Sequence, residues 1–466
     1  MIAVPIVSDS IKKALADIKK AERVADIIEV RLDYIRDINK INLTKLLAAS
    51  KQKIIITDRK NRLDLINESV RLGADFIDLD ISIGSKLIRE VTKQSKAKLI
   101  VSFHNFKETN RKELTAKYKE IKKLRPGIIK IVSFANSIND NLVIFDLINQ
   151  AKKDKVDIIA ICMGEKGEIS RILAPIYGSF LTFGSLESGK ESAPGQIPAE
   201  ILRQVYRVDK LKNPKIFGLV GNPVSHSRGI YFHNEQFKKV NKNSIYLNFL
   251  VDDPKAFIKG FKPIISGLSI TIPFKTEIIP HLDKLDPAAK EIGAVNTVVK
   301  QKDKLVGYNT DMLGAIDAIK SKTSIAGKKI LMIGAGGVAR AVGYGIVKEK
   351  GDLMITNRTE EKALELARQL NCSSTKLDNS HQLGKFDIII NCTSIGMFPK
   401  ITQTPIPKPL LNLLSKKAAV VFDTVYTPKL TKLLKDAGKL GISVVGGNDM
   451  FIAQALEQQK LFQKVK

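Results

Sequence analysis

Short apolar runs recur at near-regular intervals through the first 210 residues and alternate with polar, helix-like segments such as 11–25 and 111–124. Runs of about four to eight apolar residues between turn residues are typical of buried strands. Eight β-then-α units within about 200 residues are the number found in a (β/α)8 barrel. The pattern therefore predicts a TIM barrel over residues 1–210, with strands in the runs 2–7, 27–33, 53–59, 76–82, 98–104, 128–135, 157–163 and 180–185.

A second α/β pattern begins after the polar stretch 207–215, which ends in Asn-Pro and is expected to be a linker. Runs at 245–251 and 267–273 predict the strands of a first lobe. Residues 329–340 then have the pattern of a strand, a glycine turn and the start of a helix. We expect a parallel sheet to continue through the runs at 353–358, 386–394, 418–426 and 442–446.

Ionisable residues stand within or at the ends of the apolar barrel runs, and a barrel gathers its chemistry at the carboxyl ends of its strands. Lys130 lies in GIIKIVSFA, and His104 ends KLIVSFH. A desolvated lysine beside other cations has a lowered pKa and becomes an amine nucleophile, suited to forming a Schiff base with a ketone. Because strand side chains alternate, Glu29, Arg31 and Asp33 are expected to share one face. The candidate residues are Glu29, Arg31, Asp33, Arg59, His104 and Lys130.

Composition favours a soluble globular protein, since 44% of the residues are hydrophobic and 27% are charged. No apolar stretch reaches the ~18 residues that a membrane span needs. The run MIAVPIVSDS is interpreted as a strand rather than a signal peptide. The three cysteines, Cys162, Cys372 and Cys392, lack metal-ligand spacing, which predicts a reduced, cytoplasmic setting and no metal site.

The net charge of +28 raises the alternative of a nucleic-acid-binding protein. The Lys and Arg residues, however, divide evenly between the two halves of the chain, with no block of five like charges. Many lie on helical faces such as 117–125. We therefore expect a lysine-rich surface with mild attraction for anionic metabolites, and neither a nucleic-acid nor a membrane partner.

Gly334, Gly336 and Ala339 form G-x-G-x-x-A between a strand and a helix. Glycines at these positions permit a tight turn and let backbone N–H groups approach a pyrophosphate at the helix N-terminus. The next strand ends at Asn357-Arg358, where an NAD site usually has an acidic residue for the ribose 2′-hydroxyl. A neutral Asn and a cationic Arg suit a 2′-phosphate, so the sequence predicts NADP(H) rather than NAD.

Lys275 follows the apolar run SITIPF, and Asp311 ends GYNTD. A lysine paired with a carboxylate can pass a proton to a carbonyl oxygen as hydride arrives at the carbon. Either residue alone has an ordinary explanation, because a lysine after a strand is usually solvated and Asn-Thr-Asp is often a turn or a helix cap. Their joint occurrence with a nucleotide motif predicts an acid–base pair.

The second half of the chain resembles shikimate dehydrogenase through several separate motifs. These are GNPVSHS at 221–227, SITIPFK at 269–275, GAVNT at 293–297, YNTD at 308–311, GAGGVARA at 334–341, NRT at 357–359, NCTSIGM at 391–397, DTVYTP at 423–428 and GGNDMFIAQA at 446–455. The resemblance implies that Lys275 and Asp311 form the catalytic pair and that Tyr426 lies near the substrate carboxylate. The other implied substrate ligands are Ser227, Thr271, Asn296 and Gln454. The implied NADP ligands are Gly334, Ala335, Gly336, Gly337, Val338, Asn357, Arg358, Thr359, Thr393 and Gly447.

The first half is similar to type I 3-dehydroquinate dehydratase. The matching motifs are EVRLD at 29–33, SFH at 102–104, IIKI at 128–131, MGEKGEISR at 163–171, TFGS at 182–185 and SAPGQI at 192–197. The resemblance implies that Lys130 forms the Schiff base, that His104 transfers protons and that Glu29 orients His104. Substrate would be held by Arg31, Arg59, Arg171, Ser192 and Gln196.

The two resemblances imply consecutive steps of the shikimate pathway. The first half would dehydrate 3-dehydroquinate to 3-dehydroshikimate, and the second half would reduce that product to shikimate with NADPH. The expected domains are the barrel at 1–210, a substrate-binding domain at 214–318, a Rossmann NADP-binding domain at 319–440, and a segment at 441–466 whose helix returns to the substrate domain. Two alternatives stay open: a quinate/shikimate dehydrogenase of quinate metabolism, and a non-catalytic, metabolite-sensing regulator on the same folds.

Two positions depart from the family patterns. The dehydratases usually have Glu-Gly-Gly four residues after the arginine at Arg59, whereas this chain has Leu63 there, which puts the anchoring of Arg59 in question. The dehydrogenases usually have S-x-S-P, whereas this chain has Ser227-Arg228-Gly229 and lacks the second serine. Losing one hydrogen bond to a charged group costs about 1.5–3 kcal/mol, enough to raise KM but not to abolish hydride transfer.

Overall fold

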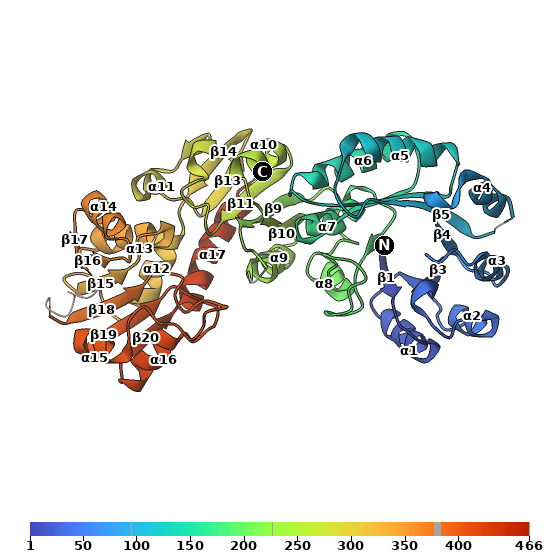
Figure 1. Cartoon of the computed structure of the whole chain (residues 1–466). Coiled ribbons are helices and arrows are strands. Elements are labelled where there is room, and N and C mark those ends of the chain that lie inside the picture. Colours follow the sequence, from blue (N-terminus) through green and yellow to red (C-terminus); the bar gives the residue numbers. More distant parts are fainter. Residues whose placement is uncertain (95, 226, 377–383, 466) are drawn as a thin grey trace. The chain divides into compact units, whose positions relative to one another are not determined.

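Two compact units make up the chain in this computed structural model (Figure 1). The first comprises Met1–Gly218 and Asn222–Ile264, and the second comprises Leu219–Gly221 and Ile265–Lys466. The structure describes residues 1–94, 96–225, 227–376 and 384–465. His226 of the motif at 221–227 therefore lies outside the described residues.

A parallel sheet of eight strands forms the core of the first unit, in the order β7-β6-β5-β4-β3-β2-β1-β8. Phe180 N donates a hydrogen bond to Ile158 O at 2.7 Å, which joins the two ends of this order. Helices connect successive strands and lie along the outside of the sheet (Figure 1). Strands buried on both faces explain the nearly continuous Ile and Val runs of the sequence. The predicted TIM barrel is confirmed.

The barrel strands are β1 Ile2–Ile6, β2 Ile27–Arg31, β3 Lys53–Thr57, β4 Phe76–Asp80, β5 Lys98–His104, β6 Ile128–Phe134, β7 Ile158–Met163 and β8 Thr182–Phe183. The helices are α1 Ile11–Ala21, α2 Lys40–Leu47, α3 Leu63–Arg71, α4 Ser85–Gln94, α5 Arg111–Lys123, α6 Asp140–Lys153, α7 Glu168–Tyr177 and α8 Ala199–Gln204. Short 3-10 turns are η1 Leu32–Tyr34, η2 Ile81–Ile83 and η3 Glu165–Gly167.

The predicted strand 27–33 is shorter in the structure than in the sequence pattern. Strand β2 ends at Arg31, and η1 follows it. Arg31 Nε and Nη2 donate to the two carboxylate oxygens of Asp33 at 3.0 and 2.7 Å. Because Asp33 lies in this 3-10 turn and not in the strand, it does not continue the alternation of Glu29 and Arg31.

The first unit also contains β10 Ser244–Leu250, α9 Gly229–Lys239 and α10 Pro254–Phe261. Hydrogen bonds tie these elements to the barrel helices and the following loop. Asn139 Nδ2 donates to Ala256 O at 2.9 Å, and Arg207 Nη2 donates to Ser244 O at 3.1 Å. The segment after the predicted linker is thus fastened to the barrel rather than free of it.

Two six-stranded sheets follow the barrel sheet. The second sheet has the order β10-β9-β11-β13-β14-β12, and the third has the order β17-β16-β15-β18-β19-β20. Their strands are β9 Lys215–Gly221, β11 Ile265–Ile270, β12 Lys284–Leu285, β13 Thr297–Gln301, β14 Lys304–Tyr308, β15 Lys329–Ile333, β16 Asp352–Thr356, β17 Ser373–Ser374, β18 Phe386–Asn391, β19 Ser415–Asp423 and β20 Ser443–Gly446. The helices of the second unit are η4 Ile279–His281, α11 Pro287–Ile292, α12 Asp311–Lys320, α13 Gly337–Lys348, α14 Glu360–Leu370, α15 Lys408–Leu414, α16 Lys432–Lys439 and α17 Gly447–Gln463.

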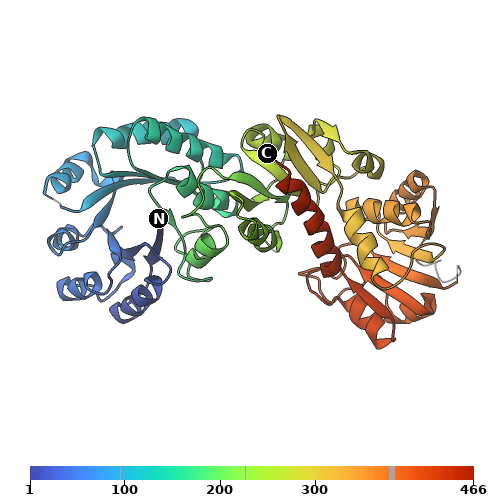
Figure 2. The same ribbon diagram turned by 180° about the vertical axis from the view of Figure 1, so that it is seen from behind.

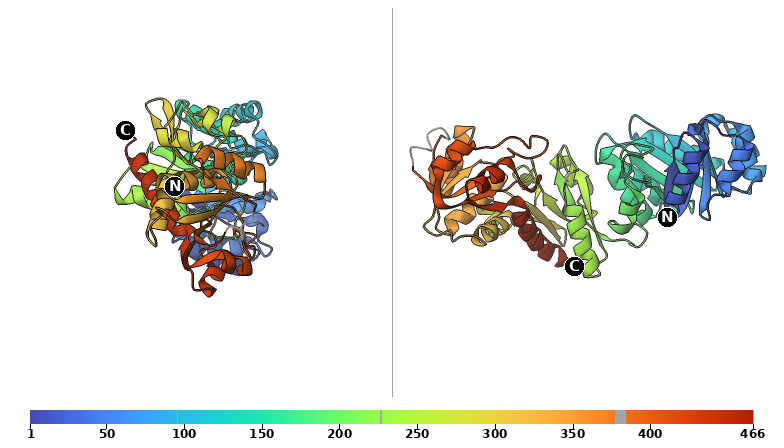
Figure 3. Two further views of the ribbon diagram at one scale, coloured as in Figure 1. Left: turned by 90° about the vertical axis from the view of Figure 1, so that its left-hand side faces the viewer. Right: turned by 90° about the horizontal axis from the view of Figure 1, so that it is seen from below.

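The third sheet is parallel, as the sequence predicts, and β15 lies between β16 and β18. Strands β13 and β14, a tight antiparallel hairpin, have no counterpart in the prediction. Helix α17, dark red in Figures 2 and 3, extends from the third sheet to β11. There Ser269 Oγ donates to Gln458 Oε1 at 2.9 Å, and Gln458 Nε2 donates to Asn296 O at 3.1 Å. Within the described residues, no helix is long and apolar enough to cross a membrane.

Candidate active sites

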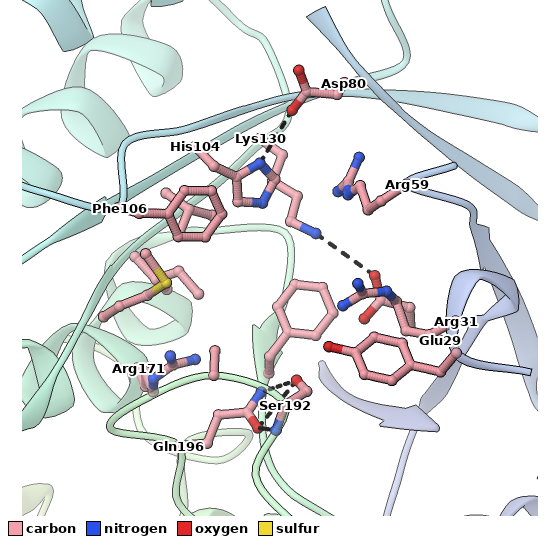
Figure 4. Close-up of a pocket in the computed structure, with 16 residues that line it drawn as sticks. Glu29, Arg31, Arg59, Asp80, His104, Phe106, Lys130, Arg171, Ser192 and Gln196 are labelled. Carbon is pink, nitrogen blue, oxygen red and sulfur yellow. Dashed lines mark hydrogen bonds and ion pairs between the residues drawn. The ribbon is translucent and has the colours of Figure 1, made fainter. Parts of the chain in front are cut away.

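A cavity of about 380 Å³ opens inside the barrel (Figure 4). It lies where the strands end, which is the face that carries active sites in barrels of this kind. All eight side chains predicted as site residues for the barrel line this cavity: Glu29, Arg31, Arg59, His104, Lys130, Arg171, Ser192 and Gln196.

Lys130 belongs to a ring of four inward-facing side chains contributed by alternate strands. The ring consists of Glu29 from β2, Asp78 from β4, Lys130 from β6 and Phe183 from β8. Lys130 Nζ lies 2.7 Å from Asp78 Oδ2, 3.7 Å from Glu29 Oε1 and 4.5 Å from the centre of the Phe183 ring. Such four-residue layers normally fill a barrel with apolar side chains. Here three of the four are ionisable, and the lysine is 5% exposed.

The charged groups closest to Lys130 Nζ are carboxylates, whereas the sequence predicts neighbouring cations. Asp78 is buried and accepts three hydrogen bonds: from Lys130, from Arg59 Nη2 at 3.0 Å and from Ser102 Oγ at 2.6 Å. Burial alone would raise the pKa of Asp78, but Arg59 and Lys130 hold it below its ordinary value. Asp78 thus stays ionised between two cations.

His104 is held by a different carboxylate from the one predicted. His104 Nδ1 lies 3.4 Å from Asp80 Oδ2, whereas Glu29 Oε1 accepts from Thr57 Oγ1 at 2.8 Å. The predicted Glu29–His104 contact is not among the hydrogen bonds of the described residues. The strand order accounts for this, since Asp80 ends β4 next to β5, which carries His104, whereas β3 and β4 both lie between β5 and β2, which carries Glu29.

The surroundings of His104 fix both its orientation and its charge. Burial lowers its pKa from the ordinary value, against the opposing effect of the Asp80 hydrogen bond. Phe106 stacks on the imidazole with ring centres 5.7 Å apart and planes 10° apart (Figure 4). Asp80 also accepts from Ser82 N at 3.0 Å, and these bonds lower the pKa of Asp80 to about 2 despite burial. His104 is therefore a neutral base with a fixed ring.

Three arginines, Arg31, Arg59 and Arg171, bring positive charge to the cavity. Arg59 reaches it from the end of β3 and is anchored by Asp78. Arg171 is 1% exposed, and burial lowers its pKa to about 10. Its Nη2 donates to Pro194 O at 3.1 Å, while its buried Nε has no hydrogen-bond partner among the described residues. A buried guanidinium with a free donor beside a cavity suits an anionic ligand.

The departure at Leu63 has a structural answer. Leu63 begins α3, and the preceding Arg62 donates to Asp58 Oδ2 at 2.9 Å and to Leu32 O at 2.9 Å. This arginine ties the loop after β3 to the loop after β2. Arg59 is anchored instead by Asp78, which accepts a hydrogen bond from Arg59 Nη2 at 3.0 Å.

Ser192 and Gln196 face the cavity from the loop before α8. Ser192 N donates to Gln196 Oε1 at 2.7 Å, and Gln196 Nε2 donates to Ser192 Oγ at 3.0 Å (Figure 4). Ser192 Oγ also donates to Gln196 Oε1 at 3.3 Å, so the two side chains hold the loop through mutual hydrogen bonds. Two polar groups are thus set at the cavity wall opposite Arg59.

The second unit brings Lys275 and Asp311 together, as predicted. Lys275 Nζ donates to Asp311 Oδ2 at 2.6 Å, and the two residues are 9% and 5% exposed. Asn296 Nδ2 donates to the other carboxylate oxygen at 2.8 Å and lies 3.3 Å from Gln454 Oε1. Four predicted residues thus meet in one hydrogen-bonded cluster: Lys275 from the segment after β11, Asn296 from just before β13, Asp311 from α12 and Gln454 from α17. Thr310, which sequence reasoning missed, donates its N–H to Asn296 Oδ1 at 2.8 Å.

The glycine turn after β15 fits a dinucleotide. Gly334 has φ +116°, a conformation that L side chains rarely adopt, and a Cβ there would lie 3.1 Å from the Cys392 backbone. A Cβ on Gly336 would meet only open space, whereas one on Gly337 would lie 3.0 Å from Lys275 Cβ. The turn that would cradle a pyrophosphate therefore also touches the lysine of the acid–base pair.

The remaining predicted nucleotide positions follow the carboxyl ends of β16, β18 and β20 in the same sheet. Asn357 Nδ2 donates to Thr359 O at 2.9 Å and shapes the loop after β16, where Arg358 is exposed. No acidic side chain stands at 357–359 to repel a 2′-phosphate. Thr393 Oγ1 donates to Asn391 Oδ1 at 2.7 Å, and a Cβ on Gly447 would lie 2.5 Å from Thr424 O. Ala335 and Val338 belong to the turn itself.

Three predicted substrate ligands remain outside the Lys275 cluster. Thr271 follows β11 and donates its N–H to Val220 O at 2.9 Å. Tyr426 stacks on Phe451 with ring centres 5.5 Å apart. Ser227 belongs to the first compact unit, where its Oγ accepts from Gly229 N at 3.1 Å. A Cβ at Gly229 would lie 3.2 Å from both Ser227 Oγ and the Tyr246 ring, so this site is tight for a second serine.

The most informative residues missed at the sequence level are Asp78 and Asp80. Both lie in the run FIDLDIS, already assigned as a strand. Ionisable residues in an apolar strand are the same signal that identifies Lys130, and it was available here. Phe106 and Tyr34, exposed aromatics at the cavity, carry no comparable signal.

Comparison with known families covers both halves of the chain. The pattern of type I 3-dehydroquinase matches residues 2–213. The pattern of the shikimate dehydrogenase substrate binding domain matches residues 219–298, and that of shikimate / quinate 5-dehydrogenase matches residues 317–403.

Two relatives match nearly the whole of this chain within a single protein each. A bifunctional 3-dehydroquinate dehydratase/shikimate dehydrogenase, chloroplastic, of Arabidopsis thaliana is 37% identical over 99% of this chain and 82% of its own length. A shikimate biosynthesis protein of Chlamydia pneumoniae is 30% identical over 99% of this chain and 95% of its own length. A solved shikimate dehydrogenase in complex with NADP+ is 38% identical, with a TM-score of 0.51 over 54% of this chain and 91% of that one.

A barrel with an ionisable core layer, followed by a Rossmann unit with a lysine–carboxylate pair, defines a chain that joins two enzymes. The comparisons make this class specific. The chain belongs to the bifunctional type I 3-dehydroquinate dehydratase/shikimate dehydrogenase family and carries these two activities of the shikimate pathway. The predicted fold and function are confirmed.

Proposed function

We propose that Lys130 and His104 carry out the dehydration and that Lys275 and Asp311 handle the proton in the reduction. The observation that carries the first assignment is a buried lysine amine in the same 380 Å³ cavity as a neutral histidine and three arginines. A ketone entering there meets a nucleophile, a base and cations for its carboxylate.

In the first reaction the unprotonated amine of Lys130 adds to the ring ketone of 3-dehydroquinate, and the carbonyl oxygen leaves as water. His104 removes the adjacent C–H proton, and its electron pair forms the enamine C=C bond. The enamine then expels the neighbouring hydroxyl, which takes the proton from His104 and leaves as a second water. Hydrolysis of the remaining imine frees 3-dehydroshikimate and the lysine.

Asp80, rather than Glu29, is the residue that we propose positions His104. Replacing Asp80 with asparagine should lower dehydratase kcat by about 10-fold or more, a part of the 10²–10⁴-fold that a positioned base contributes. Because the carboxylate raises the pKa of His104, its loss should also move the acidic limb of the rate profile to lower pH. Steady-state rates across the acidic range test both effects.

A merely structural role for Asp80 would leave that limb in place. Borohydride trapping of substrate on Lys130 in the variant checks that the barrel is still folded. An unshifted acidic limb with a normal kcat would contradict the positioning role.

In the second reaction Lys275 and Asp311 would protonate the substrate oxygen as it gains charge, with Asn296 fixing the carboxylate. NADPH, when bound, supplies the hydride. Gly334, Ala335, Gly336, Gly337 and Val338 would hold its pyrophosphate, and Thr393 and Gly447 would contribute from the carboxyl ends of β18 and β20. Ser227, Thr271, Tyr426 and Gln454 would bind the hydroxy acid.

Arg358 should set the preference for NADPH through the 2′-phosphate. Replacing it with alanine should raise KM for NADPH by about 10- to 150-fold, the equivalent of losing about 1.5–3 kcal/mol from a charged hydrogen bond. KM for NADH should hardly change. Initial rates with both cofactors measure this, and Arg368→Ala, an exposed arginine in the last turn of α14, is the matched control. Equal losses with both cofactors would exclude a 2′-phosphate role.

Quinate oxidation and metabolite sensing are the alternatives. The names of several Bacillus cereus shikimate dehydrogenases include NADP(+), which supports NADP as the cofactor. One Listeria monocytogenes shikimate 5-dehydrogenase structure, however, is described as a complex with shikimate and NAD. It is 30% identical, with a TM-score of 0.50 over 55% of this chain and 93% of that one. A coupled assay with 3-dehydroquinate and NADPH on the full chain tests the proposal. NADPH consumption supports it, preference for quinate and NAD supports the first alternative, and ligand binding without turnover supports the second.

The predicted domain limits, 1–210, 214–318, 319–440 and 441–466, are also proposals, supported by the residues that the family patterns match. A cytoplasmic location is proposed as well. Its support is chemical, because Cys162, Cys372 and Cys392 are all free thiols.

A further inference from the structure

The nitrogen of Lys130 changes its charge during the reaction proposed above. It is a neutral amine when it adds to the ketone, a positively charged protonated imine after the ketone has condensed, and a neutral enamine nitrogen after the C–H proton has left. Only the protonated imine draws electrons from the neighbouring C–H bond strongly. The reaction therefore needs a group that keeps this nitrogen protonated inside a buried site.

Asp78 occupies the place of such a group. Its Oδ2 is 2.7 Å from Lys130 Nζ, and its side chain has no solvent exposure. Glu29 is more distant at 3.7 Å and already accepts from Thr57. The other ionisable groups that line this cavity are Arg31, Tyr34, Arg59, Asp80, His104 and Arg171. Arg59 donates to Asp78, Arg31 is paired with Asp33, and Asp80 contacts His104, which is neutral when it acts as a base.

The ring geometry keeps Asp78 in place throughout the cycle. Asp78 and Lys130 project from β4 and β6, and the strand between them, β5, contributes Ser102, whose Oγ donates to Asp78 Oδ1 at 2.6 Å. Strand side chains in a packed layer have little freedom to move away. A substrate bound to the lysine therefore keeps the carboxylate as its nearest charge.

We propose that Asp78 is the counter-ion of the imine nitrogen on Lys130, and that it keeps the Schiff base protonated during dehydration. This inference rests on the proposed role of Lys130. No proton moves to Asp78, and its charge stays constant while the nitrogen alternates between the iminium and the neutral enamine. Asp78 acts directly on the reacting nitrogen and is thus a catalytic residue.

The test is the basic limb of the dehydratase rate profile in Asp78→Asn. A carboxylate favours the protonated imine, so its removal lowers the imine pKa and moves the basic limb of kcat to lower pH. An opposite charge this close shifts a pKa by about 1–3 units. Measuring kcat at saturating substrate separates this effect from weaker binding through Arg59. Ser102→Ala, which removes a hydrogen bond to Asp78 but keeps its charge, should leave the limb in place.

Borohydride trapping distinguishes failure of the inference from failure of the mechanism. If wild-type enzyme yields no adduct on Lys130, the Schiff-base mechanism is wrong and the inference falls with it. If Lys130 is trapped in both proteins and the basic limb is unmoved in Asp78→Asn, the inference alone is overturned.

A measurement on the wild-type chain covers the case of an unfolded variant. The C=N stretch of the imine that forms on Lys130 with substrate, recorded by Raman spectroscopy at alkaline pH without borohydride, should shift in D2O because the nitrogen carries a proton. A band that does not shift in D2O overturns the counter-ion assignment.

Discussion

Replacing Lys130 with alanine is expected to abolish dehydration of 3-dehydroquinate and to leave the reduction of 3-dehydroshikimate intact. The variant has no amine to form the imine, and the remaining base and cations cannot supply an electron sink. We expect a loss of at least about 10⁴-fold in kcat, beyond the 10²–10⁴-fold of acid–base catalysis alone. The enone absorbance of 3-dehydroshikimate measures the first activity, and NADPH consumption measures the second.

Lys98→Ala is the matched control, since Lys98 also belongs to a barrel strand but lies at its amino end, paired with Asp157 at 2.6 Å. It should keep both activities and the borohydride adduct on Lys130. Dehydration at the normal rate in Lys130→Ala would show that the barrel does not use a Schiff base on this lysine.

Replacing Lys275 with alanine should abolish most of the dehydrogenase activity and leave the dehydratase activity intact. Lys275 donates to Asp311 at 2.6 Å inside a buried cluster, so the variant loses the cation that protonates the developing alkoxide and leaves Asp311 uncompensated. Dehydrogenase kcat should fall by about 10²–10⁴-fold. Dehydratase activity should stay unchanged, and the rate of NADPH oxidation with added 3-dehydroshikimate gives the measurement.

Lys290→Ala, at an exposed position on α11, is the control for loss of a lysine near this lobe. A solvent isotope effect on kcat that is the same in Lys275→Ala and wild type, at undiminished rate, would mean that the proton reaches the substrate by another route.

Much of the barrel site can be predicted from the sequence because most of its residues lie in or at the ends of strands. Lys130 and His104 interrupt apolar runs, and buried charge in such a run needs a reason. The same rule applies to Asp78 and Asp80, although neither residue belongs to a motif that carries the resemblance to the dehydratases. Their importance depends on which strands are neighbours, and only the order β6-β5-β4 places Asp78 beside Lys130.

The interpretation of Glu29 shows the limit of alternation arguments. Position 29 faces inward as predicted, but facing inward does not decide which of several inward groups is the partner. The side chain meets Thr57 on the next strand, and His104 meets Asp80 instead. In the second unit the sequence pattern does not predict the β13–β14 hairpin. Its strands have only five residues each, and the two-residue turn between them consists of the charged residues Lys302 and Asp303.

The ring of Glu29, Asp78, Lys130 and Phe183 is built wholly from strands, whereas Tyr34 and Phe106 reach the same cavity from the connecting segments after β2 and β5. Groups on strands are held more precisely than groups on loops. The cavity therefore combines reactive side chains held rigidly on strands with side chains on less rigid connecting segments. Laboratory evolution toward other ketones could vary the segment that carries Tyr34, provided that the ring residues and Phe106, which stacks on His104, are kept.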